Sequence, residues 1–137
     1  MTDKKTAPRR CNLPTPLQNQ PVLSRDQAVA MERIFKVLAN ATRLRILHML
    51  VRAPDTAVGV LANSIGMQPQ AVSNQLRRLM DRGIVAARRD GNSIRYRIVD
   101  ACTIDLLAQG FCLAFYDQET AASFSQVATA NQNSPLT

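Results

Sequence analysis

The stretch at residues 56–82, TAVGVLANSIGMQPQAVSNQLRRLMDR, constrains the fold of this chain more than any other part of its sequence. Its first half repeats apolar residues at helical spacing up to Ile65. Gly66 then stands where the end of a helix favours a residue with positive φ. Pro69 suits the first position of a second helix, because the N–H that proline lacks would have no helical partner there. The stretch therefore predicts two short helices joined by a tight turn.

The second of these helices has two different faces. Val72, Leu76 and Leu79 form one stripe and predict a buried side. Two helices with such a division predict a helix-turn-helix, although an ordinary helical hairpin with a solvated face would show the same pattern. The other face carries amide, hydroxyl and guanidinium groups of the kind that read base edges: Gln70, Ser73, Asn74 and Arg77.

Two short runs rich in β-branched residues follow at once, IVAARR at 84–89 and SIRYRIV at 93–99. Between them, Asp90-Gly91-Asn92 is typical of a hairpin turn. One arginine alone on such a hairpin would be an ordinary solubilising residue, but four of them favour contact with a polyanion. A basic hairpin behind a helix-turn-helix is the layout of a winged helix, whose wing would carry toward a phosphate backbone Arg88, Arg89, Arg95 and Arg97.

Length and charge agree with a nucleic-acid partner. The 137 residues support one domain with a single core. The formal net charge is +7, and residues 73–100 hold seven arginines against three aspartates, whereas residues 101–137 hold three acids and no Lys or Arg. A basic surface of this kind raises affinity for DNA through counterion release.

Nothing in the sequence predicts a membrane partner. No apolar run approaches the ~18–20 residues that cross a bilayer, and no basic amphipathic helix with aromatic anchors is visible. The N-terminal segment lacks the apolar core of a secretion signal. We therefore expect a cytoplasmic protein.

The pattern divides the chain into three parts. Residues 1–22 are polar and rich in proline, and predict a disordered basic arm. Residues 23–118 predict the winged helix-turn-helix domain, which is mostly α with a small β-hairpin. Residues 119–137 are small and polar, and predict a flexible tail. The last helix has a wide apolar surface for so small a body, which predicts a homodimer.

Helix starts and buried residues follow from local patterns. SRDQ at 24–27 forms a capping box for a first helix. Asn40 and Asp100 are expected to cap the second and the last helix, and Asp55 or Thr56 the first helix of the helix-turn-helix. The second helix is expected to bury Leu44, Leu47, Met49, Leu50 and Val51.

Three linked segments, FKVLANATRLRILHMLV, SIGMQPQAVSNQLRRLMDRGIV and RRDGNSIRYRIVD, resemble the ArsR/SmtB family of bacterial winged-helix repressors. The resemblance spans roughly residues 24–116, with a departure at Ala41, where many members have proline. It implies a homodimer formed by the first and last helices, which binds double-stranded operator DNA and releases it when an inducer binds. The DNA-binding residues that it implies are Gln68, Gln70, Ser73, Asn74 and Arg77 in the recognition helix and Arg88, Arg89, Asn92 and Arg95 in the wing.

The family varies in its inducer sites. Many members carry a cysteine pair in the third helix, where this chain reads AVGVLANS and has no ligand. A persulfide-sensing branch has a cysteine in the second helix where this chain has His48, its single histidine, which we interpret as structural. Free cysteine is also a common small buried residue. The candidate metal ligands are the three cysteines, Cys11, Cys102 and Cys112.

Cys102 and Cys112 lie ten residues apart in the last helix, which is about 15 Å of rise, so one helix cannot close a site with both. Two such helices packed antiparallel would bring Cys102 to the partner's Cys112, and the last-helix metal sites of the family, built from Asp, His and Glu, work in this way. With Cys11 as a third ligand, such a site would suit a thiophilic inducer, namely trivalent arsenic or antimony, or Cd, Pb or Hg. A thiol-redox or persulfide response is the alternative.

The sequence predicts no enzyme. It has no glycine-rich phosphate loop, no acid and base paired on one face, and a single histidine. The alternative from another class is a winged helix that serves as a protein-interaction module, which would have little affinity for DNA.

Overall fold

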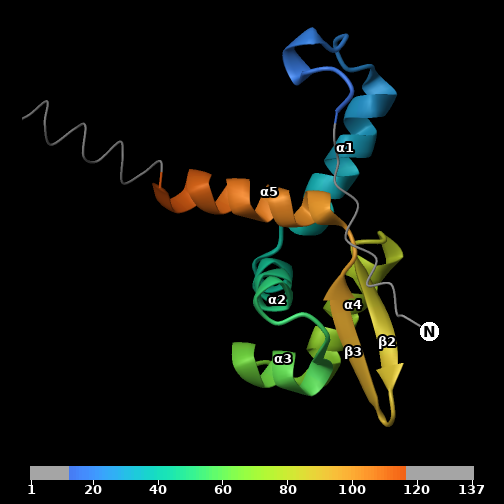
Figure 1. The fold of residues 1–137 in the computed structure, drawn as a ribbon, viewed down its shortest axis with the longest axis vertical. Coiled ribbons are helices and arrows are strands. Elements are labelled where there is room, and N and C mark those ends of the chain that lie inside the picture. The colour runs from blue at the N-terminus through green and yellow to red at the C-terminus, as the bar shows by residue number, and fades with distance from the viewer. Residues whose placement is uncertain (1–12, 117–137) are drawn as a thin grey trace, which may run out of the picture. The chain divides into compact units, whose positions relative to one another are not determined.

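The structure, a computed structural model, describes residues 13–116. These residues belong to two compact units that divide between residues 104 and 105. No helix in the described range is long and apolar enough to cross a bilayer. The elements are a 3-10 helix at Leu17–Asn19, α1 (Arg25–Leu38), α2 (Ala41–Arg52), β1 (Thr56–Ala57), α3 (Val58–Ile65), α4 (Pro69–Asp81), β2 (Val85–Asp90), β3 (Ser93–Ile98), α5 (Ala101–Phe111) and a π-helical turn at Cys112–Tyr116 (Figure 1).

Three of the predicted helix caps are confirmed. Ser24 and Gln27 exchange the two hydrogen bonds of the capping box, at 3.2 and 3.0 Å. The side chains of Asn40 and Asp100 each accept a hydrogen bond of 3.0 Å from a backbone N–H in the first turn of α2 and α5. The cap expected at residues 55–56 is wrong, because Thr56 lies in β1 and its hydroxyl donates to a carbonyl behind it. α3 instead begins without a side-chain cap.

The predicted turn between α3 and α4 is also confirmed. Gly66 ends α3 in the left-handed region with φ 66° and ψ 36°, where a side chain would be strained. The N–H of Met67 donates to the carbonyl of Ala62 at 2.9 Å, which is the hydrogen bond that closes such a helix end. Pro69 then occupies the first turn of α4. The two helices of the helix-turn-helix are therefore set by local backbone chemistry.

The predicted hairpin of the wing is confirmed, and it belongs to a sheet with one strand more than the sequence predicts. β2 and β3 pair antiparallel with a register that runs from Val85–Ile98 to Asp90–Ser93. Gly91, with φ 60°, supplies the backbone conformation that this tight turn requires. β1, which the sequence does not predict, pairs antiparallel with the other edge of β3, so the sheet order is β1-β3-β2. This short strand ties the start of the helix-turn-helix to the wing.

The core of the first unit lies between α2, α3, α4 and the sheet. The predicted stripe on α4 is confirmed, because its three apolar residues have no exposed surface. The prediction for α2 is partly wrong: Leu44 and Val51 are 40% and 39% exposed, whereas Ile46 is fully buried. The face of α2 that meets the core follows the helical spacing i, i+3, i+4 and i+7 from Arg43. The largest fully buried side chains are Ile46, Leu47, Leu50, Leu61, Val72, Leu76 and Leu79.

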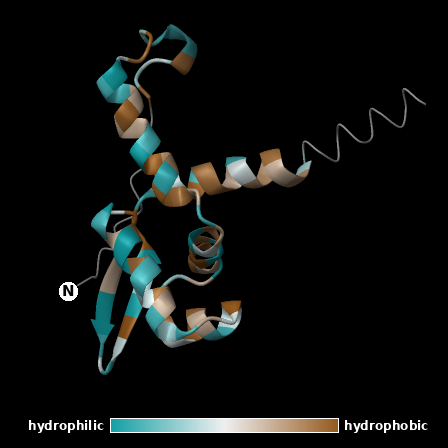
Figure 2. Cartoon of the chain, turned by 180° about the vertical axis from the view of Figure 1, so that it is seen from behind, coloured by the Kyte–Doolittle hydropathy of each residue, from teal (hydrophilic) through white to brown (hydrophobic). Residues whose placement is uncertain are grey.

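α1 covers little of this core. Met31, Ile34 and Phe35 are 41–51% exposed, and Leu38 is the buried residue of the helix. Figure 2 shows hydrophobic patches along α1 that alternate with hydrophilic ones. An apolar face this open in a protomer is typical of a helix that packs against another chain.

Candidate nucleic-acid interface

The predicted reading face of α4 lies on the surface of the protein. Gln70, Asn74 and Arg77 are exposed, and Ser73 is half-buried. The side-chain amide of Gln70 donates to Asn74 Oδ1 at 3.2 Å, which places these two residues on one face, one turn apart. Gln68 is exposed at the N-terminus of the helix. The face thus lies opposite the buried stripe, and its exposure leaves it able to enter a DNA groove.

The predicted wing residues lie beside α4, because β2 packs against that helix. Arg88, Arg89 and Asn92 are exposed, and Arg95 is half-buried. The outer part of β2 is hydrophilic throughout (Figure 2). The strand register sets Arg88 directly opposite Arg95. Two like charges in such a pair repel one another, so the hairpin needs compensating acids.

Two aspartates provide this compensation. Arg95 Nε lies 2.9 Å from Asp90 Oδ2, at the tip of the wing. Arg95 also donates from Nη1 to the backbone carbonyl of Asp55 at 3.1 Å, and Arg88 Nε lies 3.9 Å from Asp55 Oδ1. Both wing arginines are therefore held by acids in the free protein, and a phosphate would compete with those acids.

Asp55 is an unusual residue in this network. Its φ of 58° is in the left-handed region, which few residues other than glycine adopt. Its buried Oδ1 accepts no hydrogen bond within residues 13–116, because 3.9 Å to Arg88 Nε is a charge contact but too long for a hydrogen bond. The sequence predicts a helix cap at Asp55 and a turn at Asp90, and in neither case an ion pair with the wing arginines. Its position inside a basic hairpin was the signal that could have identified Asp90, whereas no local signal relates Asp55 to the wing, which begins about 30 residues later.

The candidate sensor cysteines lie at the two ends of the last helix. Cys102 is half-buried in the first turn of α5, and Cys112 is exposed at the start of the π-helical turn. Neither forms a disulfide within residues 13–116. The first belongs to the unit that ends at residue 104 and the second to the unit that begins at 105. Cys11 lies outside the described residues, and His48 is exposed on α2.

The side chains around the two cysteines do not form a metal site within one protomer. Within residues 13–116, no three His, Cys, Asp or Glu side chains gather in one protomer to hold a metal. Asp100, beside the first cysteine, already uses both oxygens, since Oδ1 accepts from the N–H of Cys102 at 3.0 Å and Oδ2 from the hydroxyl of Thr103 at 3.1 Å. Thiolate donors without a carboxylate suit soft ions better than Zn²⁺ sites built from oxygen and nitrogen.

The chain matches a family model described as the MarR family over residues 40–93. This segment is less than half of the chain and runs from the cap of α2 to the first residue of β3. It therefore covers the helix-turn-helix and most of the wing, but neither α1 nor α5.

Individual proteins match more of the chain. It is 39% identical over 82 residues to a probable mercury resistance operon repressor of Streptomyces lividans, a match that covers 60% of this chain and 65%, just under two thirds, of that protein. The AntR antimony-specific transcriptional repressor has a crystal structure that is similar with a TM-score of 0.69 and 47% identity, over 80% of this chain and 99% of that one. A homodimeric winged helix-turn-helix DNA-binding domain from Mycobacterium bovis, described as a possible ArsR-family regulator, is similar with a TM-score of 0.62 and 32% identity, over 74% and 95%.

Proposed function

This chain belongs to the ArsR/SmtB family of winged-helix transcriptional repressors, a DNA-binding and non-enzymatic family, and on that premise we propose that it is an operator-binding repressor released by a thiophilic metal or metalloid ion. The observation that carries the DNA-binding part is the exposed polar face of α4 beside an arginine-rich wing. The domain that performs it is residues 23–118, flanked by an arm at 1–22 and a tail at 119–137. We place it in the cytoplasm, where operator DNA is accessible.

In this proposal α4 reads bases and the wing holds the phosphate backbone. Arg77 projects from the exposed face of α4, where a guanidinium can bond guanine in the major groove. Arg88 and Arg89 extend from the outer part of β2, where their charge meets phosphates without regard to sequence. The remaining members of the set are Gln68, Gln70, Ser73, Asn74, Asn92 and Arg95.

Two single substitutions test these roles on duplex DNA selected for binding. Arg77→Ala should weaken binding to the selected site by about 1–3 kcal/mol, with little change on random duplex. Arg88→Ala should weaken both DNAs alike and flatten the salt dependence. Arg25→Ala removes the same charge from the exposed start of α1 and is the matched control. Unchanged affinity in both test variants would refute the proposed interface.

The repressor acts as a homodimer in this proposal. The apolar faces of α1 and of the last helix support it, because Phe35 is 51% exposed and Phe111 is 48% exposed in the protomer. Burying such side chains against a second copy stabilises a dimer by roughly 25 cal/mol per Å² of apolar surface removed from water. The similar Mycobacterium bovis domain is homodimeric. A two-fold dimer also presents two copies of α4 to two half-sites.

The inducer in this proposal is captured by thiolates. Cys102 and the partner's Cys112 supply sulfur ligands, and Cys11 supplies a third. The local chemistry of the first turn of α5 supports this, because a half-buried thiol lies there beside Asp100, whose carboxylate already accepts two hydrogen bonds as a helix cap. Relatives whose names state resistance to mercury and specificity for antimony support soft ions. The ion would be trivalent antimony or arsenic, or Cd, Pb or Hg.

A band-shift assay with bound operator DNA tests the inducer. Antimonite, arsenite, cadmium and persulfide are added in parallel to the wild type, Cys102→Ser and Cys112→Ser. A metalloid or metal should release the wild type, and both variants should repress but fail to respond. Cys11→Ser should have a smaller effect, because a ligand on a terminal arm must be ordered on binding.

Thiol oxidation is the second candidate, and one observation favours it. Cys112 is exposed, as reactive cysteines must be. Release by persulfide or oxidant with no metal present would assign the site to this chemistry. If none of the four reagents releases the DNA, neither sensor proposal holds and the cysteines serve packing.

A further inference from the structure

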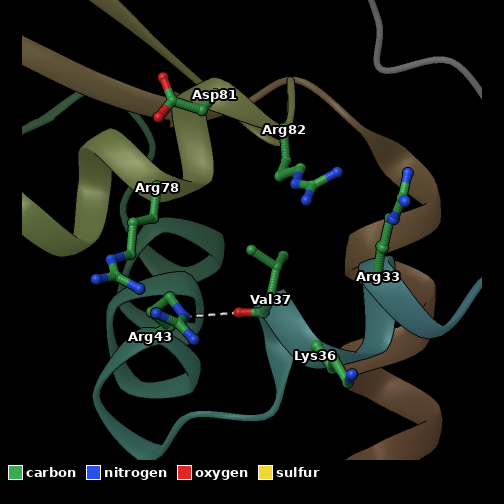
Figure 3. A pocket seen from close by; sticks show the side chains of 7 residues that line it. All are labelled: Arg33, Lys36, Val37, Arg43, Arg78, Asp81 and Arg82. Atoms are coloured by element: carbon green, nitrogen blue, oxygen red, sulfur yellow. Dashed lines mark hydrogen bonds between the residues drawn. The ribbon is translucent and has the colours of Figure 1, made fainter. Parts of the chain in front are cut away.

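A basic pocket lies in the first unit, between the C-terminal half of α1, the start of α2 and the C-terminal end of α4 (Figure 3). Its volume is about 540 Å³, which is enough for a small organic ligand. The residues that line it are Arg33, Lys36, Val37, Arg43, Arg78, Asp81 and Arg82. Neither the DNA-binding face nor the cysteines take part in it.

Charge is the distinctive property of this pocket. Five of its seven lining residues are cationic and one is acidic. Lys36 is satisfied by Glu32, whose carboxylate lies 2.6 Å from its ammonium group and whose pKa is held below its ordinary value by that hydrogen bond. The carboxylate of Asp81 points away from the space around Val37 (Figure 3). The pocket therefore has a surplus of positive charge that its own acid does not balance.

Arg43 makes this surplus costly. It is 8% exposed, and it donates from Nε to the carbonyl of Val37 at 2.6 Å and from Nη1 to Gln75 Oε1 at 3.0 Å. Both acceptors are neutral, so among residues 13–116 this buried guanidinium is hydrogen-bonded without an ion-pair partner, an arrangement that is expensive in a protein interior. Figure 3 shows the guanidinium of Arg78 beside it, which adds a second like charge.

We propose that this pocket binds a small oxyanion that carries more than one negative charge, with the chemistry of a phosphate group. Arg33 lines it from α1, and Arg78 and Arg82 line it from the end of α4 (Figure 3). Within residues 13–116, none of these three arginines is engaged in an ion pair. Planar guanidinium groups bind such oxyanions through paired N–H donors, which suits phosphate better than chloride.

The position of the pocket favours a free anion over the DNA backbone. Gln70 in the reading face and Arg82 at the C-terminal cap are twelve residues apart, which is about 18 Å along a helix. Arg77, the last residue of the proposed reading face, precedes Arg78 by one residue, but successive residues project about 100° apart around a helix, and Arg78 lines the pocket whereas Arg77 does not. A bound anion would instead bridge arginines of α1 and of the C-terminal end of α4.

The test uses the full-length protein, with inorganic phosphate and pyrophosphate as probes in calorimetric titrations at constant ionic strength. Pyrophosphate should bind more tightly than phosphate, at one site per protomer. The double variant R78A/R82A should lose about tenfold or more in pyrophosphate affinity. R25A/R52A, which removes two exposed arginines outside the pocket, has the same net charge and should lose less than about twofold.

A second variant and a DNA arm make the test decisive. Arg33→Gln should also weaken pyrophosphate binding, which decides the matter if circular dichroism shows that the double variant is unfolded. Equal losses in R78A/R82A and R25A/R52A, or no saturable binding to the wild type, would overturn the proposal. The DNA arm compares operator binding by the wild type and by R78A/R82A in phosphate-free buffer. If the double variant binds operator DNA less well and the wild type does not bind pyrophosphate, the arginines contact the DNA backbone and the proposal is overturned.

Discussion

Asp90 at the tip of the wing restrains an arginine that the proposed interface needs. Asp90 Oδ2 lies 2.9 Å from Arg95 Nε, and a phosphate must displace this carboxylate to bind the same guanidinium. The substitution Asp90→Asn removes the charge while it keeps the size and the turn preference of the residue. We therefore expect the variant to bind DNA more tightly than the wild type.

The size of this effect follows from the exposure of the pair. The side chains of Arg95 and Asp90 are 40% and 55% exposed, and ion pairs this open are worth about 0.2–1 kcal/mol. Loss of the pair in the free protein favours the DNA complex by that free energy, which corresponds to a gain in DNA affinity of roughly 1.4-fold to fivefold for each protomer. A dimer with two wings would gain about twofold to 30-fold.

Fluorescence anisotropy with a random duplex measures this gain, because contacts with phosphates do not depend on sequence. The salt dependence should become steeper by up to about 0.9 for each freed arginine. Asp26→Asn, at an exposed acid in the first turn of α1, changes the net charge equally and is the control. If the two variants tighten binding to the same extent, Asp90 does not restrain Arg95 and the reasoning is refuted.

Three further substitutions test the fold and the assembly. Leu76→Ala, at a fully buried position in α4, should lower the free energy of unfolding by about 2–5 kcal/mol in urea titrations; a loss below 1 kcal/mol would mean that the core is misplaced. Gly66→Ala should cost about 1–2 kcal/mol, because its φ is 66°, and a neutral result would contradict the left-handed turn. Phe111→Glu, at a side chain 48% exposed in the protomer, should yield monomers in sedimentation without unfolding them, and a variant that stays dimeric would place the interface elsewhere.

The features that the sequence predicts correctly are those that local chemistry determines. The capping box at Ser24, the left-handed turn at Gly66 and the hairpin turn at Gly91 each depend on residues within one or two turns of the backbone. The buried stripe of α4 follows from helical periodicity alone. The exposed face on the opposite side of that helix is then fixed as well.

The features that the sequence misses depend on residues that are distant in the chain. Arg43 takes a core-facing position on α2 because Val37 and Gln75 accept its hydrogen bonds, which shifts the buried face away from Leu44. β1 is too short to show any periodicity, and its pairing with β3 spans about 40 residues of the chain. The contact between Asp55 and the wing has the same cause.

The basic pocket illustrates the same limit. Arg33 on α1 and Arg82 after α4 are distant in sequence, and each alone is an ordinary exposed arginine. They line one pocket, together with Val37, only when α1, α2 and α4 are packed (Figure 3). No pattern in the sequence relates them.

The affinity for a random DNA duplex at several salt concentrations tests the central claim, that this chain binds DNA through α4 and an arginine-rich wing. We count three wing arginines in each protomer of a dimer, Arg88, Arg89 and Arg95. They predict that the logarithm of the binding constant falls with the logarithm of salt concentration with a slope between about −3 and −5. Weak binding with no dependence on salt would contradict the claim. It would mean that the winged helix is a protein-interaction module.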